Sequence, residues 1–256
     1  MNGKKIVSIS ITLLMIFSIL SGIASASKSD KTSEEESCDD GTDENVKEEV
    51  VGLSPDGKDT LMKRTTSHPA KAKEHKASSG SKCYRLMGIS WTTPSVPYTI
   101  NPVGSGAGME AVVTAFTTSI GTWDAGTSRT LFGAGTIDGL AGYGYDGKNT
   151  LLFGSSLGVG TIAQTTTWYY SLSREIVEFD IEYNNMFAWG NAEADPTKMD
   201  LEGIATHELG HGIGLADIYT TPCKEVTMFG YSTEGEFKKR TLESGDLTGL
   251  WRIYGR

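Results

Sequence analysis

The sequence predicts an α+β domain over residues 83–256, in which a β-sheet packs against α-helices. Three observations support this class: an amphipathic helical pattern at 107–125, alternating strand patterns between residues 151 and 183, and two helical patterns at 200–212 and 244–254. A helix followed by strands and then by two helices is typical of α+β domains. The segment is also long enough to bury the core of one domain.

The first predicted helix carries apolar residues at helical spacing, namely Met109, Val112, Val113, Phe116, Ile120 and Trp123. Strands are predicted at Leu151–Phe153 and at Thr161–Thr165, where Gly and Ser turns separate short apolar runs. A third strand alternates apolar residues with carboxylates, so we expect one buried and one solvated face; its residues are Val177, Glu178, Phe179, Asp180, Ile181, Glu182 and Tyr183. The strand order stays unassigned.

Two further helices follow these strands. Asp200 is a suitable N-cap for a helix that runs to about Gly212, with Leu201, Ala205 and Leu209 as its packing stripe. The last helix is predicted to be capped near Ser244, with an apolar stripe formed by Leu247, Leu250, Trp251 and Tyr254.

Residues 1–26 have the pattern of a secretory signal peptide. Lys4 and Lys5 precede the largely apolar run 6–23, and Ala24-Ser25-Ala26 is a cleavage site of small residues. The alternative is an uncleaved membrane anchor, because the apolar run is near the minimum length that spans a bilayer. The signal peptide predicts a secreted, extracellular or cell-surface protein without a stable membrane partner after cleavage.

Residues 27–82 differ from the rest in composition, because Lys, Glu, Asp, Ser and Thr dominate and aromatic residues are almost absent. Such a segment buries too little apolar surface to offset its ordering entropy, so we expect it to be mostly disordered. Its place between a signal and a domain indicates a propeptide, which could bind its own domain. A solvated tether is the alternative.

The chain has three cysteines and a formal net charge of −9. In an exported protein Cys83 and Cys223 could pair, tying the start of the domain to a later loop. Cys38 is the third cysteine. It is either an incidental free thiol, or a thiolate that occupies the open position of a metal site until the propeptide is cut off. The 83–256 segment is also acidic and has no basic clusters, which argues against nucleic acid and anionic lipid as partners.

The sequence from His207 to Asp217 reads H-E-x-x-H-x-x-G-x-x-D. His207 and His211 lie one helical turn apart, so both imidazoles can reach one ion. Gly214 allows a sharp turn, after which Asp217 can supply a third ligand. Glu208 can hold a water in the open fourth position, the arrangement of a catalytic rather than a structural zinc site. A polar surface helix is the alternative interpretation.

The motif from His207 to Asp217, followed by Met228, resembles the metzincin metallopeptidases. The segments 176–184 and 241–255 are similar to the strand before the active-site helix and to the last helix of matrixins. The resemblance implies a zincin domain with a mixed, twisted sheet and three helices, one catalytic Zn²⁺, and a methionine turn at Met228 beneath the metal.

Two features depart from the matrixin pattern. Asp217 stands where most matrixins have a third histidine, although some metzincin-like peptidases use aspartate there. No histidine lies between His75 and His207, so a second, structural zinc is not expected, and nothing in the sequence supports a calcium site.

We therefore expect a zinc endopeptidase that hydrolyses peptide bonds with metal-activated water and Glu208 as general base. Its partner would be an extended polypeptide, which adds a strand to a sheet edge. Thr161–Thr165 is the candidate edge, and an internal strand is the alternative. Two other functions remain open: a non-catalytic adhesion protein with a structural metal, and a metal amidase acting on cell-wall substrates.

Overall fold

The computed structural model describes residues 44–70 and 82–256, which form a mixed β-sheet and three α-helices. The helices are α1 (Met109–Ala125), α2 (Leu201–Gly212) and α3 (Ser244–Tyr254), with short 3-10 turns at Thr221–Cys223 and Lys238–Arg240. The strands are β1 (Val46–Leu53), β2 (Thr60–Pro69), β3 (Val96–Asn101), β4 (Phe132–Ile137), β5 (Thr150–Gly154), β6 (Thr161–Tyr170), β7 (Ile176–Asn184), β8 (Trp189–Gly190) and β9 (Met199–Asp200). This architecture is compatible with the predicted α+β class.

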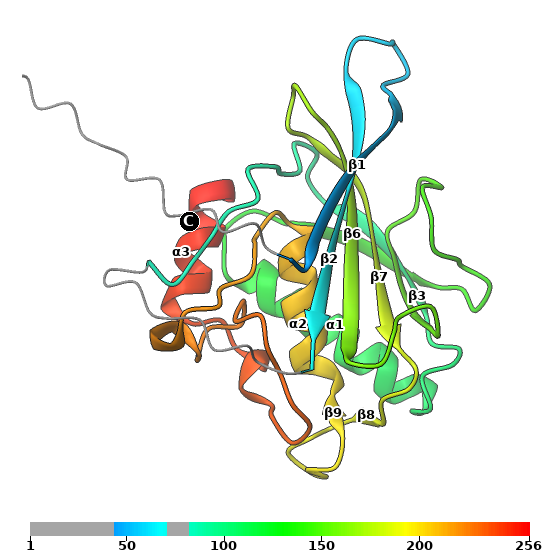
Figure 1. The fold of residues 1–256 in the computed structure, drawn as a ribbon, viewed down its shortest axis with the longest axis vertical. Coiled ribbons are helices and arrows are strands. Elements are labelled where there is room, and N and C mark those ends of the chain that lie inside the picture. The colour runs from blue at the N-terminus through cyan, green and yellow to red at the C-terminus, as the bar shows by residue number, and fades with distance from the viewer. Residues whose placement is uncertain (1–43, 71–81) are drawn as a thin grey trace, which may run out of the picture. The chain divides into compact units, whose positions relative to one another are not determined.

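Seven strands form the main sheet in the order β1-β2-β6-β7-β5-β3-β4. The β1, β2, β6 and β7 strands are antiparallel neighbours, whereas β7, β5, β3 and β4 run parallel to one another. Helix α2 packs against α1 and against β6 and β7, so it is enclosed between another helix and the sheet (Figure 1).

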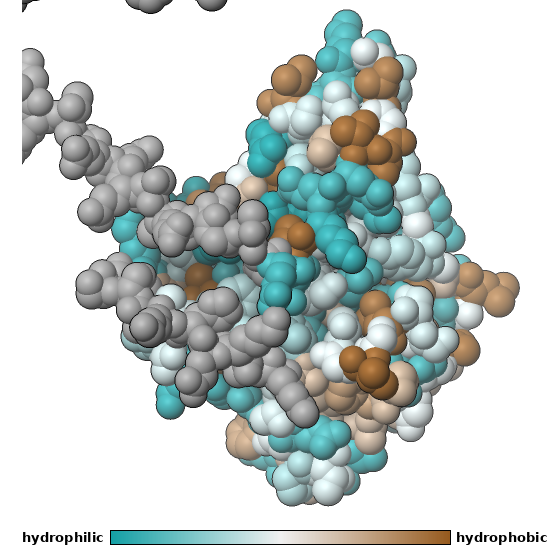
Figure 2. Space-filling model, viewed as in Figure 1, coloured by the Kyte–Doolittle hydropathy of each residue, from teal (hydrophilic) through white to brown (hydrophobic). Residues whose placement is uncertain are grey.

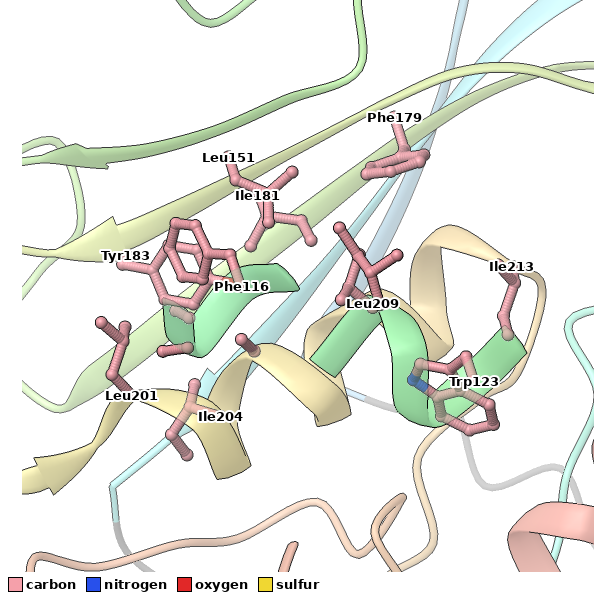
Figure 3. Packing of buried hydrophobic residues seen from close by; sticks show 14 of the residues in the cluster. Phe116, Trp123, Leu151, Phe179, Ile181, Tyr183, Leu201, Ile204, Leu209 and Ile213 are labelled. Carbon is pink, nitrogen blue, oxygen red and sulfur yellow. The ribbon is translucent and has the colours of Figure 1, made fainter. Parts of the chain in front are cut away.

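The core lies between the sheet and the helices α1 and α2. Figure 3 shows strand side chains such as Leu151, Ile181 and Tyr183 on the side of the sheet that carries Phe116 of α1 and Leu209 of α2. All five of these side chains are buried. Because apolar side chains cover α2 on two sides, even its polar residues Thr206, His207, Glu208 and His211 are removed from water.

The predicted disorder of residues 27–82 is wrong for the part that the structure describes. Residues 46–53 and 60–69 form the β1–β2 hairpin, and β2 pairs with β6 along its length. The segment carries little apolar surface of its own, but it gains order from the backbone hydrogen bonds that β6 offers.

Figure 2 shows apolar residues exposed on the projecting hairpin, where Val50 and Leu53 are 67% and 64% exposed. The predicted signal peptide, Cys38 and residues 71–81 lie outside the described residues.

The prediction that Thr161–Thr165 is a sheet edge is also wrong for this form of the chain. These residues begin β6, which has β7 on one side and β2 on the other. The neighbour on the β2 side comes from the segment that was expected to be disordered. The alternative, an internal strand, is therefore the one observed.

The carboxylate face of β7 is buried rather than solvated. Glu178, Asp180 and Glu182 are at most 5% exposed, because loops fold over them and donate backbone hydrogen bonds. Glu178 accepts the N–H groups of Asp146 and Gly147, and Asp180 accepts that of Thr150 at 2.9 Å. Alternation correctly placed Phe179, Ile181 and Tyr183 in the core, whereas Val177 is only half-buried. The pattern could not show that loop backbone would cover the polar side chains.

Asp180 should make the stability of the protein depend on pH. Burial raises the pKa of its carboxyl to about 7, whereas an unfolded aspartate titrates near 3.8. The folded state therefore binds more protons between about pH 4 and pH 7, so the free energy of unfolding falls as pH rises through this range. We expect the stability of the wild type relative to Asp180→Asn to fall by roughly 2–4 kcal/mol between these limits. Denaturant unfolding at several pH values tests this; a difference that stays constant with pH would contradict it.

The predicted pairing of Cys83 with Cys223 is confirmed, with 5.2 Å between the two Cα atoms. The bond ties the start of the 83–256 segment to the loop between Asp217 and Met228. Within residues 44–70 and 82–256, no helix has both the length and the apolar composition that crossing a bilayer requires.

Candidate metal centre

Helix α2 carries His207, Glu208 and His211 on the part of its surface that faces the sheet and the loops after the helix. Asp200 begins the helix as predicted, since its carboxylate accepts the N–H of Gly203 at 2.8 Å. All three of these side chains are fully buried, with 0% exposure. The rings of His207 and His211 lie 4.9 Å apart between centroids, as residues one turn apart should.

The turn after the helix brings Asp217 back to the two imidazoles. Gly214 has a φ of +97°, and a Cβ there would lie 2.2 Å from the carbonyl oxygen of Ile89, so only glycine fits. The Asp217 Oδ1 atom lies 3.1 Å from His207 Nε2 and 3.4 Å from His211 Nε2. The structure therefore brings together the three residues that the sequence predicted as ligands.

Backbone carbonyls fix the orientation of both helix histidines. His207 Nδ1 lies 2.8 Å from the carbonyl oxygen of Thr227, and His211 Nδ1 lies 2.8 Å from that of Leu215. A carbonyl can only accept, so each Nδ1 carries the proton and donates it. In the neutral ring the lone pair is then left on Nε2, the state in which an imidazole binds a metal, so His211, whose pKa the Asp217 carboxylate raises, must release its Nε2 proton when an ion binds.

The atoms that face one another at this site lack hydrogen-bond partners. Among the described residues, His207 Nε2, His211 Nε2 and Asp217 Oδ1 are buried side-chain atoms without one. Buried polar atoms are rarely left unsatisfied, and three lone-pair donors in close approach call for a shared cation. The ligand atoms of these three residues lie within 4.8 Å of one another. Two imidazoles and a carboxylate thus fit a metal ion.

Asp217 and His211 are strongly coupled electrostatically. Burial opposes protonation of His211, but the Asp217 carboxylate outweighs it and raises the pKa of the ring to about 9. For His207, burial and then the nearby Lys239 ammonium lower the pKa to about 3. Burial raises the pKa of Glu208 to about 7. The negative charge of Asp217 is therefore balanced by the protonated ring of His211. A bound metal ion would supply this positive charge instead.

Two residues that support this site, Tyr219 and Lys239, were not identified from the sequence. The Tyr219 hydroxyl donates to Asp217 Oδ2 at 3.0 Å, which turns Oδ1 toward the histidines. Lys239 is 2% exposed; its ammonium donates to the carbonyl of Thr227 at 3.0 Å and to that of Phe229. Neither residue belongs to a motif with fixed spacing, so no sequence signal could single them out.

Met228 lies directly beneath the helix that carries the histidines. A Cβ at Gly210 would lie 2.3 Å from the Met228 sulfur, so the two residues are in close contact. The backbone N–H groups of Thr227 and Met228 donate to the Asp246 carboxylate, at 2.9 and 3.0 Å. Asp246 belongs to α3, so this helix fixes the turn whose Thr227 carbonyl orients His207. Met228 therefore packs against the helix that carries the two histidines.

Each carboxylate oxygen of Glu208 has a partner from the sheet. Thr165 of β6 donates its hydroxyl to Oε2 at 2.5 Å, and the ring of His68 lies 3.1 Å from Oε1 through Nδ1. His68 was not predicted as a site residue, because it lies in the segment that was expected to be disordered. It is 0% exposed, and its ring lies 4.1 Å from that of His207.

Comparisons with known proteins found no family model and no curated protein that matches this chain. What the site does is therefore inferred from its own residues.

Proposed function

We propose that this protein is a secreted, zinc-dependent endopeptidase of metzincin type, with His207, His211 and Asp217 as metal ligands and Glu208 as general base. The observation that carries the proposal is the convergence of three buried, unpartnered ligand atoms beside a glutamate on the same helix. Two nitrogens and one oxygen are the donors of a catalytic zinc site, which keeps its fourth position for water or substrate.

The metal ion and the side chains would have different roles in peptide hydrolysis. Bound zinc would supply Lewis acidity, which polarises a peptide carbonyl and lowers the pKa of an attacking water. Glu208 then accepts the proton of that water and passes it to the leaving nitrogen. Thr165 holds the carboxylate in place through Oε2.

The surroundings of the site support the metzincin assignment. The glycine turn at Gly214 and the close contact of Met228 with the ligand helix are arrangements that the resemblance implies. Export is supported by the apolar, lysine-flanked N-terminus and by the disulfide between Cys83 and Cys223, since such bonds persist in oxidising compartments.

The test of this function is a metal-dependent cleavage assay. A recognition sequence for a site-specific protease is introduced within residues 71–81 of the full chain, the folded protein is cut there, and the released N-terminal part is removed. We expect the product to degrade casein, to lose this activity with 1,10-phenanthroline, and to regain it with added Zn²⁺. Metal binding without cleavage of casein or of a peptide library would favour a non-catalytic protein; cleavage of murein fragments alone would favour the amidase.

A further inference from the structure

The ring of His207 lies between a buried carboxylate and a buried ammonium. On one side, His207 Nε2 is 3.1 Å from Asp217 Oδ1, and on the other, His207 Nδ1 is 3.2 Å from Lys239 Nζ. The ring of His211 has a different environment, because its Nδ1 faces the carbonyl of Leu215. Of the two helix histidines, His207 is therefore the one that has opposite charges at its two nitrogens.

Lys239 is the only buried lysine within residues 44–70 and 82–256. Removing an ammonium from water is costly unless acceptors surround it. In this part of the chain its contacts are two backbone carbonyls and the His207 ring rather than a carboxylate. Burial lowers the pKa of Lys239, and among nearby charges the Asp217 carboxylate is the one that raises it most. The partner charge of Lys239 thus lies on the other side of the ring.

The methionine turn is held from two sides by groups of opposite charge. The Asp246 carboxylate accepts two backbone N–H groups of the turn, and the Lys239 ammonium donates to the carbonyls of Thr227 and Phe229. A carbonyl oxygen has two lone pairs, so that of Thr227 can accept from both Lys239 and His207 Nδ1. An ammonium cannot accept a hydrogen bond, so Nδ1 has to donate to this carbonyl. That contact directs Nε2 toward Asp217.

The charge of Lys239 also matters for a centre in which one ligand is a carboxylate. A divalent ion held by two neutral imidazoles and Asp217 has one positive charge less than the same ion held by three imidazoles. Lys239 returns one fixed positive charge to the same buried region, next to a ligand ring.

We propose that Lys239 is a positioning residue of the metal centre, which fixes the ring of His207 through the Thr227 carbonyl and balances the anionic ligand Asp217 across that ring. This inference rests on the proposed function, because it takes the centre to bind a metal ion. Lys239 touches neither the ion nor the substrate, and it acts only through the groups that it holds.

The positioning role is tested by the dissociation constant for Zn²⁺ of the full chain, as wild type, Lys239→Met and Lys238→Met. Lys238 is a matched control, because it is the adjacent lysine in the same 3-10 turn but is 30% exposed and pairs with Glu236 at 3.4 Å. We expect Lys239→Met to raise the constant at least about tenfold, as loss of a group that orients a ligand does. Lys238→Met should leave it unchanged. An unchanged or lower constant in Lys239→Met would overturn the positioning role.

The charge balance is tested on the metal-free chain by a double-mutant cycle of Asp217→Asn and Lys239→Met. The denaturant midpoint of unfolding is measured for the wild type, the two single variants and the double variant. If the two charges stabilise each other, the double variant should lose less than the sum of the two single losses. Losses that add would overturn the charge balance.

NMR of the wild type replaces these variants if Lys239→Met does not fold. The buried ammonium should give a ¹H–¹⁵N signal that is protected from exchange with water. Asp217→Asn should shift this signal, whereas Asp56→Asn should not, because Asp56 is 57% exposed and lies in the turn between β1 and β2. The absence of a protected signal, or a signal that Asp217→Asn leaves in place, would contradict the proposal. None of these measurements involves peptide cleavage, so zinc binding without casein cleavage would count against the proposed function alone.

Discussion

Replacing Glu208 by glutamine is expected to lower the hydrolytic rate of the cut protein by about 10²- to 10⁴-fold, the range that general acid–base catalysis contributes. Glutamine keeps the size of the side chain and can accept a hydrogen bond from Thr165, but it cannot take a proton from water at neutral pH. Casein cleavage at saturating zinc measures the rate, and metal analysis of the same sample should show an unchanged zinc content.

Glu202 provides the matched control for this substitution. It lies on the same helix but is about a quarter exposed and is 4.0 Å from Arg240, away from the histidines. Glu202→Gln should retain the wild-type rate. If Glu208→Gln cleaved casein as fast as Glu202→Gln, another group would have to act as the base, and the role given to Glu208 would be refuted.

Replacing Gly214 by alanine is expected to destabilise the fold by roughly 2–4 kcal/mol, because two costs coincide there. The backbone at φ +97° disfavours any side chain, and the new Cβ would overlap the carbonyl oxygen of Ile89. Relief of the overlap must move Leu215, whose carbonyl orients His211. We therefore also expect weaker zinc binding. Denaturant unfolding and metal titration measure the two effects.

A second glycine separates these two costs. Gly106 also has a positive φ, +68°, but a Cβ there meets nothing within 4 Å. Gly106→Ala should cost about 1 kcal/mol from backbone strain alone and should leave zinc affinity unchanged. Equal destabilisation by the two substitutions would show that contact with Ile89 is unimportant at Gly214.

The helices and the cluster of His207, His211 and Asp217 could be predicted from the sequence because their signals are local. Apolar spacing located α1, and Asp200 was correctly identified as the N-cap of α2. The ligand spacing from His207 to Asp217 reflects helix and turn geometry, which depends on neighbouring residues only. The structure brings Asp217 to the two histidines, although its role as a ligand stays a prediction.

The parts that could not be predicted depend on contacts between distant segments. His68 lies in a polar segment whose order comes from β6, so composition alone indicated disorder. The carboxylates of β7 appeared solvated because the loops that cover them leave no trace in its alternating pattern. Lys239 reaches the carbonyls of Thr227 and Phe229 from another part of the chain. Each of these contacts is set by tertiary packing.

The most direct test of the whole account is the zinc stoichiometry of the purified full chain, compared with those of Asp217→Ala and Glu208→Gln. The account predicts one tightly bound zinc per chain in the wild type and in Glu208→Gln, because Glu208 is a base and not a ligand. Asp217→Ala should lose the ion on dialysis against a weak chelator. Equal retention of zinc by Asp217→Ala, or no bound zinc in the wild type, would contradict the metal centre on which the proposed function depends.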